Sequence, residues 1–283
     1  MRPVFFPVFI AICVLMAGCG SRQDTYSFER GFFAVQKKAL AIINNPEATP
    51  PAELKNVVDA LMVYAKRDAE KKAAVDARFI IAKLYLAKKE YAKVRETLAG
   101  IRSVYAKNEP IRAEVVFMEG QLAEDQGDWD QALTKYQEIM HTYFKTPRGM
   151  EIPIYIAMHY KEKLQPDKMI VAFREAESYY TGMAARYPRS QFAYKCMVMT
   201  SKVQAELKEW PEVVKTLEAV IAEFKDKVPT ISMRLDIANI YGTRLNDKAT
   251  AQKLLQKIID EDPKAPAAKV ARAMLDNLSK EKP

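Results

Sequence analysis

The sequence predicts an all-α fold in which about five helix-turn-helix units stack into a solenoid that ends in a C-terminal capping helix. The composition is rich in Ala, Lys, Leu and Glu, and only 9 of the 283 residues are glycine, which favours helices along the whole chain. Residues 120–136 have the form of a helix, a Gly-Asp turn and a second helix. Their pattern of small and apolar residues recurs at steps of 37 or 38 residues. A constant period of this length is the signature of stacked repeats.

The clearest unit has the sequence GQLAEDQGDWDQALTKY. Gly120 and Ala123 are small residues on its first helix, and Gly127 lies in the turn. The apolar face of its second helix begins with Trp129 and Tyr136. Small residues let paired helices approach each other, and aromatic residues at helical spacing fill the space between them. This pattern resembles a tetratricopeptide repeat (TPR), and the resemblance implies that residues 26–280 form a right-handed superhelix.

The elements can be placed in order from the N-terminal side. Residues 28–44 show helical spacing of apolar residues, Pro46 ends that helix, and Pro50 and Pro51 open the next one. The first unit formed in this way is degenerate. The units span about 28–72, 73–110, 111–148, 149–189, 190–228 and 229–263, with a capping helix within 264–280. An amphipathic helix after the final repeat covers the apolar surface that the last unit would expose.

One step in the series is longer than the others. Between Met169 and Val213, which hold matching positions in consecutive units, the step is 44 residues. The extra residues fall within 179–189. We expect this insertion to lengthen the second helix of its unit or to bend the superhelix, and so to change the direction of the solenoid.

The N-terminal residues 1–18 have the layout of a signal peptide: one Arg, an apolar run over residues 4–16, and small residues before Cys19. The segment is too short and too poorly flanked for a membrane-spanning helix. Residues 15–19, Leu-Met-Ala-Gly-Cys, resemble the bacterial lipobox. The alternative is an ordinary secretory leader followed by a chance Cys.

The lipobox resemblance implies that Cys19 becomes the first residue of the mature chain. It would carry a diacylglyceryl thioether on sulfur and a third acyl chain, such as palmitate, on its amine. More than one acyl chain is needed for stable anchoring. Gly20 and Ser21 follow, and neither is the Asp that retains many lipoproteins at the inner membrane, which points to the periplasmic face of the outer membrane. Residues 19–25 then form the lipidated Cys and a short tether.

The sequence gives no positive sign of catalysis. The net charge is +8, but basic and acidic residues alternate along helix faces, which indicates solvated surface rather than a nucleic-acid site. No phosphate-binding loop, nucleophile elbow or zinc-protease motif occurs. His159 and Glu162 share a helix face, yet they make a poor metal site, and Cys196 has no His near it in sequence. We therefore predict a protein that is not an enzyme and has no cofactor, metal or small-molecule substrate.

TPR proteins commonly bind partners in the groove that their first helices line. By register with Gly120, that groove would present a mixed apolar and charged surface suited to an apolar helix or an extended segment of a partner. The alternative is that these residues contact the neighbouring repeat. The predicted partner-binding residues are Phe79, Lys83, Glu114, Phe117, Gln121, Glu124, Ile154, Met158, Lys161 and Met197.

A lipobox followed by TPR-like units resembles the TPR outer-membrane lipoproteins of bacteria, a family with members in the β-barrel assembly machinery. Residues 187–190, Tyr-Pro-Arg-Ser, are similar to an inter-repeat phrase of that family. The resemblance implies a membrane-anchored scaffold that binds protein partners during envelope assembly, with β-barrel assembly components as candidate partners. The main alternative is a peptidoglycan- or division-associated lipoprotein that regulates cell-wall enzymes, and an enzyme built on a helical superstructure is a third.

Overall fold

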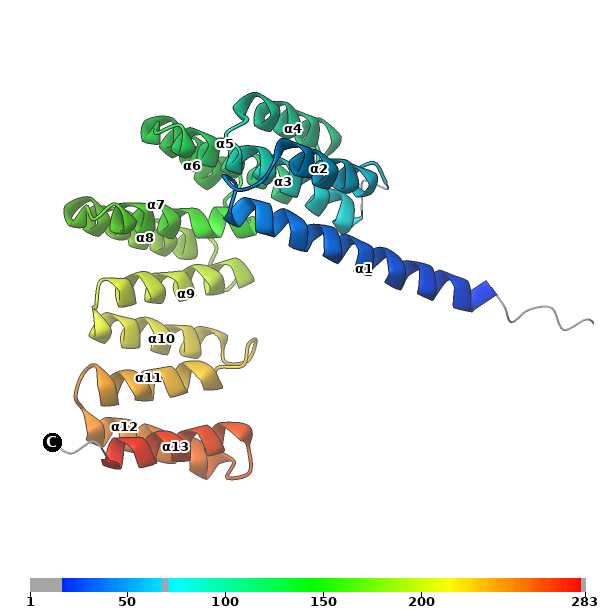
Figure 1. The fold of residues 1–283 in the computed structure, drawn as a ribbon. Helices are drawn as coiled ribbons and strands as arrows, with labels where there is room; N and C mark the ends of the chain where they lie inside the picture. Colours follow the sequence, from blue (N-terminus) through cyan, green and yellow to red (C-terminus); the bar gives the residue numbers. More distant parts are fainter. Residues whose placement is uncertain (1–16, 68–70, 281–283) are drawn as a thin grey trace, which may run out of the picture. The chain divides into compact units, whose positions relative to one another are not determined.

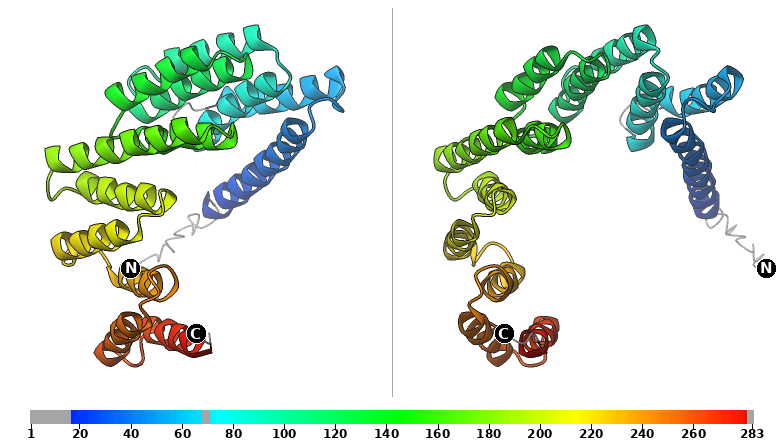
Figure 2. Two further views of the ribbon diagram at one scale, coloured as in Figure 1. Left: turned by 90° about the vertical axis from the view of Figure 1, so that its left-hand side faces the viewer. Right: turned by 60° about the vertical axis from the view of Figure 1, so that its left-hand side comes forward.

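The computed structural model describes residues 17–67 and 71–280, and within them every regular element is an α-helix. Consecutive helices run back and forth, as can be followed for α9 to α13 in Figures 1 and 2. This confirms the prediction of an all-α solenoid. The helices are α1 Ala17–Asn44, α2 Pro51–Ala65, α3 Lys72–Ala87, α4 Tyr91–Val104, α5 Glu109–Asp125, α6 Trp129–Thr142, α7 Pro147–Glu162, α8 Pro166–Arg186, α9 Gln191–Glu206, α10 Trp210–Phe224, α11 Ile231–Thr243, α12 Lys248–Glu261 and α13 Pro266–Lys280.

The helices form two compact units, Met1–Lys135 and Tyr136–Pro283, and the boundary falls inside α6. Each repeat expected from the sequence contains one pair of helices, from α1 and α2 to α11 and α12, and α13 follows them. Residues 1–16, which make up most of the predicted signal peptide, lie outside the described part of the chain.

The first helix includes the residues expected to form the short tether. It starts at Ala17, so residues 19–25 are helical in the structure. No proline interrupts the sequence between residues 8 and 45, and the one glycine within residues 19–25, Gly20, lowers helix propensity without breaking a helix. The helical pattern of residues 28–44 therefore continues toward the N-terminus.

The core of the first unit begins where α1 packs against α2 and α3. Phe32, Ala39 and Ile42 of α1 are buried there with Leu61 of α2 and Leu84 of α3. Ala39 and Ile42 follow Phe32 at helical spacing, so they form one stripe along α1. A second cluster joins α3, α4 and α5. Both clusters lie between helices that are close in sequence, as expected of a solenoid in which each repeat contacts its neighbours.

The second unit repeats this arrangement with larger side chains. Phe173 and Tyr180 of α8 are fully buried, and the Tyr180 hydroxyl donates a hydrogen bond of 2.6 Å to the Met150 carbonyl of α7. At the C-terminal end, Ala268, Ala271 and Leu278 of α13 are buried against α11 and α12. In this position α13 covers the apolar surface of the last pair.

The turns between paired helices share a left-handed residue. Lys89, Gly127, Leu164, Lys208 and Asn246 have φ between 54° and 79°. They follow one another at steps of 38, 37, 44 and 38 residues, which are the steps of the apolar pattern. A left-handed residue after a helix is a common way to end it. The backbone therefore repeats with the same period as the side chains.

The insertion in residues 179–189 lengthens α8. This helix has 21 residues, whereas α6 and α12 each have 14. The difference of seven residues equals the difference between the 44-residue step and the 37-residue step before it. Ser190 then caps α9, because its hydroxyl accepts a hydrogen bond of 3.0 Å from the Ala193 amide. The first of the two expected effects, a longer second helix, is what the structure shows.

Candidate functional site

A cavity of about 510 Å³ lies in the second unit, lined by α8, α9 and α10. Ala193, Thr200 and Gln204 of α9 are buried, so this helix forms the floor. The α8 and α10 residues at the rims are mostly exposed. A volume of this size is within the usual range for ligand pockets and can hold several side chains of a bound segment.

The insertion supplies one wall of this cavity. Thr181, Ala184, Ala185 and Pro188 all lie within residues 179–189 and line the cavity from α8 and the turn after it. Their small side chains leave open the space that larger residues would fill. Ala219 of α10 is the small residue on the opposite wall. The cavity therefore exists because α8 is longer and because its added residues are small.

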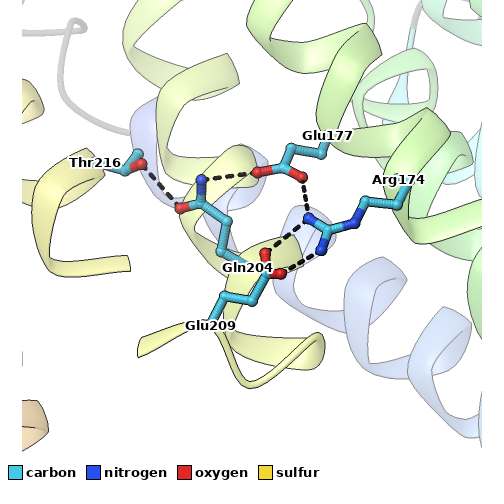
Figure 3. A network of polar contacts seen from close by, with 5 residues as sticks. All are labelled: Arg174, Glu177, Gln204, Glu209 and Thr216. Atoms are coloured by element: carbon cyan, nitrogen blue, oxygen red, sulfur yellow. Dashed lines mark hydrogen bonds and ion pairs between the residues drawn. The ribbon is translucent and has the colours of Figure 1, made fainter. Parts of the chain in front are cut away.

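A network of polar contacts that includes three cavity-lining residues, Glu177, Gln204 and Thr216, connects α8, α9 and α10 (Figure 3). Gln204, only 5% exposed, donates from Nε2 to Glu177 Oε1 at 2.9 Å. Its own Oε1 accepts a hydrogen bond of 2.8 Å from the Thr216 hydroxyl. Arg174 Nη1 donates to Glu177 Oε2 at 2.8 Å and to Glu209 Oε2 at 2.7 Å, and its Nη2 makes a second contact with Glu209. A buried amide held from both sides orients the floor of the cavity.

The charges near the cavity are mainly negative. Glu177, Glu212 and Glu223 line it together with one cation, Lys215, which lies 3.6 Å from Glu212. Glu223 also accepts a hydrogen bond of 3.0 Å from the Arg189 amide. Two exposed carboxylates beside the small side chains of the walls favour a partner segment that carries a basic side chain.

Hydrogen bonds in the network change the proton affinities of its charged members. The bonds from Arg174 hold the pKa of Glu209 below its usual value, and the same carboxylate, followed by Glu177, raises the pKa of Arg174. On the neighbouring turns of α9, burial raises the pKa of the Cys196 thiol to about 11. At neutral pH that thiol is protonated, and a protonated thiol is a poor nucleophile.

The histidines and carboxylates do not gather into a metal site in the described residues. No three side chains of His, Cys, Asp or Glu lie close enough together there to hold an ion. Burial, followed by the charge of Lys163, lowers the pKa of His159. The imidazole is therefore neutral at neutral pH.

In the first unit, the two predicted groove phenylalanines are part of the interior. Phe79 is 9% exposed and Phe117 is 5% exposed. Phe79 packs with Val94 of α4 and Val115 of α5, so it contacts the next repeat. Lys83 is exposed, whereas the other predicted residues of this unit, Glu114, Gln121 and Glu124, are half-buried.

In the second unit, the predicted groove residues separate into two places. Ile154 and Met158 of α7 are half-buried. Lys161, at the end of the same helix, donates from Nζ to Glu206 Oε2 of α9 at 2.6 Å. Met197 of α9 instead lines the cavity between α8 and α10. Of the ten predicted residues, Met197 is the one that belongs to this cavity.

Sequence reasoning had missed most of the cavity, although a signal was present. The insertion is visible as a 44-residue step, and the residues from Thr181 to Ala185 are small except for Met183. Thr216 and the carboxylates of α10 carry no such signal, because similar residues occur on every exposed helix face.

Two segments of the chain match the family model of the tetratricopeptide repeat, residues 114–143 and 234–265. The first covers most of α5 and α6, and the second covers most of α11 and all of α12. The comparison with curated proteins finds no match. The chain is similar to the crystal structure of a tetratricopeptide repeat protein from Parabacteroides merdae ATCC 43184, with 12% identity and a TM-score of 0.39 over 89% of this chain and 88% of that one. The matched segments identify the pairs α5–α6 and α11–α12 as tetratricopeptide repeats, a type of repeat that commonly mediates protein interactions.

Proposed function

We propose that this chain is a lipid-anchored scaffold of the bacterial envelope that binds protein partners through the cavity between α8 and α10. The observation that carries this proposal is the cavity itself, which the insertion opens in a solenoid whose other second helices are short. Scaffolds act by binding, so they need shape and complementary charge at the contact rather than reactive groups. The protonated Cys196 and the fully engaged Arg174 network agree with such a role.

The partner segment has a chemistry that the walls define. Small side chains at Ala184, Ala185 and Ala219 accept an extended chain or one face of a helix. Glu212 and Glu223 at the rims pair with a Lys or Arg of that segment. Half-buried Met197 on the floor supplies an adaptable apolar contact. The groove residues Ile154, Met158 and Lys161 of α7 are proposed as further contacts within the second unit, and Lys83 of α3 as a separate contact within the first.

The envelope location rests on the N-terminal sequence. A signal-peptide layout followed by Leu-Met-Ala-Gly-Cys is the observation that supports lipidation at Cys19 and a place on the periplasmic face of the outer membrane. In the part of the chain that the structure describes, no helix is long and apolar enough to cross a membrane. Among envelope pathways, assembly of outer-membrane β-barrel proteins is the one that the resemblance of the sequence favours.

The test is a pull-down from detergent-solubilised membranes with two matched variants of α10. Ala219 lines the cavity and Ala222 does not, although both are exposed alanines of the same helix. Ala219→Trp fills the cavity and is expected to lose the partner at least tenfold, whereas Ala222→Trp keeps it. Circular dichroism of both variants shows that the fold is retained.

The identity of the captured proteins separates the two candidate functions. β-Barrel assembly components that are lost with Ala219→Trp support the proposal in its full form. Peptidoglycan fragments or wall synthases that co-purify equally with both variants would contradict the cavity assignment. They would support the alternative of a wall-associated lipoprotein, for which the net charge of +8 is the favouring observation.

A further inference from the structure

The face of α1 opposite the core carries a regular stripe of basic and apolar residues. Arg30, Phe33, Lys37 and Leu40 follow one another at spacings of three, four and three residues, which places them on one side of the helix. We call these four residues the α1 stripe. Phe33 is 68% exposed and Leu40 is 57% exposed, although both are large apolar side chains.

The α1 stripe is not needed for packing within the first unit. The buried stripe of Phe32, Ala39 and Ile42 already joins α1 to α2 and α3. Arg30 and Lys37 form no ion pair with the residues that the structure describes. A helix that buries one stripe and exposes a second one containing Phe and Leu has a second contact surface in addition to the one that faces the core.

We propose that the α1 stripe lies on an anionic phospholipid surface. The chemistry of the stripe fits this surface better than a protein groove. Phe33 and Leu40 reach the boundary between headgroups and acyl chains. Arg30 lies about one helical turn from Phe33, and Lys37 lies about one turn from Leu40. Their charged groups stay among the lipid phosphates while their aliphatic stems lie near the apolar layer.

The position of α1 in the chain supports a membrane as the occupant. This inference rests on the proposed lipid anchor, because α1 is continuous from Ala17 and therefore includes Cys19. At a rise of about 1.5 Å per residue, Phe33 lies about 21 Å and Leu40 about 32 Å along the helix from Cys19. Both can contact the bilayer only if α1 lies along its surface. The stripe thus predicts the orientation of the anchored protein.

The test measures the depth of two labels on the mature, anchored chain in vesicles that contain phosphatidylglycerol. Leu40→Cys places an environment-sensitive fluorophore on the stripe, and Lys38→Cys places it on another exposed face of the same helix at a similar distance from Cys19. Buried Cys196 stays unlabelled, and the thioether at Cys19 has no free thiol. Spin-labelled lipids in the vesicles quench a fluorophore that enters the acyl layer.

The expected result is quenching at position 40 at least threefold stronger than at position 38, and its loss in the additional variants Arg30→Glu and Lys37→Glu. Equal quenching at the two positions would overturn the inference, as would quenching that is the same in vesicles of zwitterionic lipid. Protection of the label by a protein partner without any quenching would assign the stripe to that partner instead.

A flotation measurement keeps the two proposals apart. If the chain floats with the vesicles but the two labels do not differ, the anchor stands and the orientation fails. If the chain does not float, the anchor proposal fails. The same two labels are then placed on a Cys19→Ser chain produced without residues 1–18, and so without Cys13, in excess phosphatidylglycerol vesicles. There a quenched position 40 supports the stripe and an unquenched one contradicts it.

Discussion

At the scale of single residues, Gly149 is a position that has no room for a side chain. It lies in the first turn of α7, where its amide donates a hydrogen bond of 3.1 Å to the hydroxyl of the capping Thr146. A Cβ added there would lie 2.2 Å from the Tyr143 carbonyl oxygen and 2.7 Å from the Phe144 Cα. Both are backbone atoms, so no side-chain rotation can make room.

Gly149→Ala is therefore expected to destabilise the protein by about 3 kcal/mol, because the turn must move. Gly182→Ala is the matched control. Gly182 is inside α8 with nothing within 4 Å of an added Cβ, so its substitution is expected to stabilise by up to about 1 kcal/mol through helix propensity. Urea unfolding of both variants measures the two effects. Similar stabilities would mean that the α6–α7 turn is not packed as described.

The left-handed residue Leu164 is strained in its turn. Its φ is 55° and its side chain is exposed, so it contributes little packing in return for the strain. Leu164→Gly is expected to stabilise the protein by about 1 kcal/mol, because glycine adopts this conformation without a steric cost. Thermal unfolding measures the change. The equivalent Gly127→Ala should destabilise by a similar amount, and a gain in stability there would contradict a left-handed conformation at this repeat position.

At the scale of elements, the ion pair between Arg174 and Glu209 connects α8 to the residue immediately before α10. The pKa of Glu209 is lowered in the folded state, chiefly by hydrogen bonds from Arg174. A lowered carboxyl pKa stabilises the fold above the unfolded pKa, and this contribution is lost as the pH falls through the folded pKa.

Arg174→Met should accordingly lower stability at neutral pH and leave it nearly unchanged in acid, where Glu209 is protonated in both proteins. The side chain of Arg174 is half exposed, so solvent screening limits the effect to at most about 1 kcal/mol. Urea titrations at the two pH values give the comparison. If the difference in unfolding free energy between Arg174→Met and the unchanged protein were the same at both pH values, Arg174 would act through packing alone.

The sequence predicts the positions of the repeated helices well, but it predicts less well which faces of those helices are buried. Steps of 37, 38 and 44 residues predict the helix pairs, because small and apolar residues at matching positions are required wherever two helices meet. The burial of Phe79 and Phe117 does not follow from those steps. Both lie three residues before the small residue of their helix, at the edge of its apolar stripe, and the angle of the next repeat decides whether they are covered.

The cavity shows the same limit: the sequence predicts the length of a helix but not the direction in which its side chains point. The step of 44 residues predicts a longer α8, but the cavity forms only because Thr181, Ala184 and Ala185 turn toward α9 and α10. Met197 lines the cavity because its side of α9 also faces the cavity. Successive side chains of a helix point in directions about 100° apart. The repeat spacing alone therefore does not determine which side chains point toward a neighbouring helix.

At the scale of the whole molecule, the proposed anchor predicts the composition of the mature chain. On this proposal, processing at the lipobox would remove residues 1–18, and the mature protein would begin with Cys19 carrying acyl chains on its sulfur and amine. Mass spectrometry of protein purified from membranes is expected to show this N-terminus, and Cys19→Ser should release the chain from the membrane fraction. An unmodified Cys19 in membrane-bound protein would contradict the anchor, because attachment would then depend on other contacts.

Cross-linking in living cells tests the central claim, that the cavity between α8 and α10 receives a partner protein. A photo-reactive residue is placed at Ala219, which lines the cavity, or at Ala222 on the same helix outside it. We predict that position 219 forms a specific cross-link to one envelope protein and that position 222 does not. Equal cross-linking from both positions, or none from 219 in cells where the protein is folded and anchored, would contradict the assignment of this cavity as the binding site.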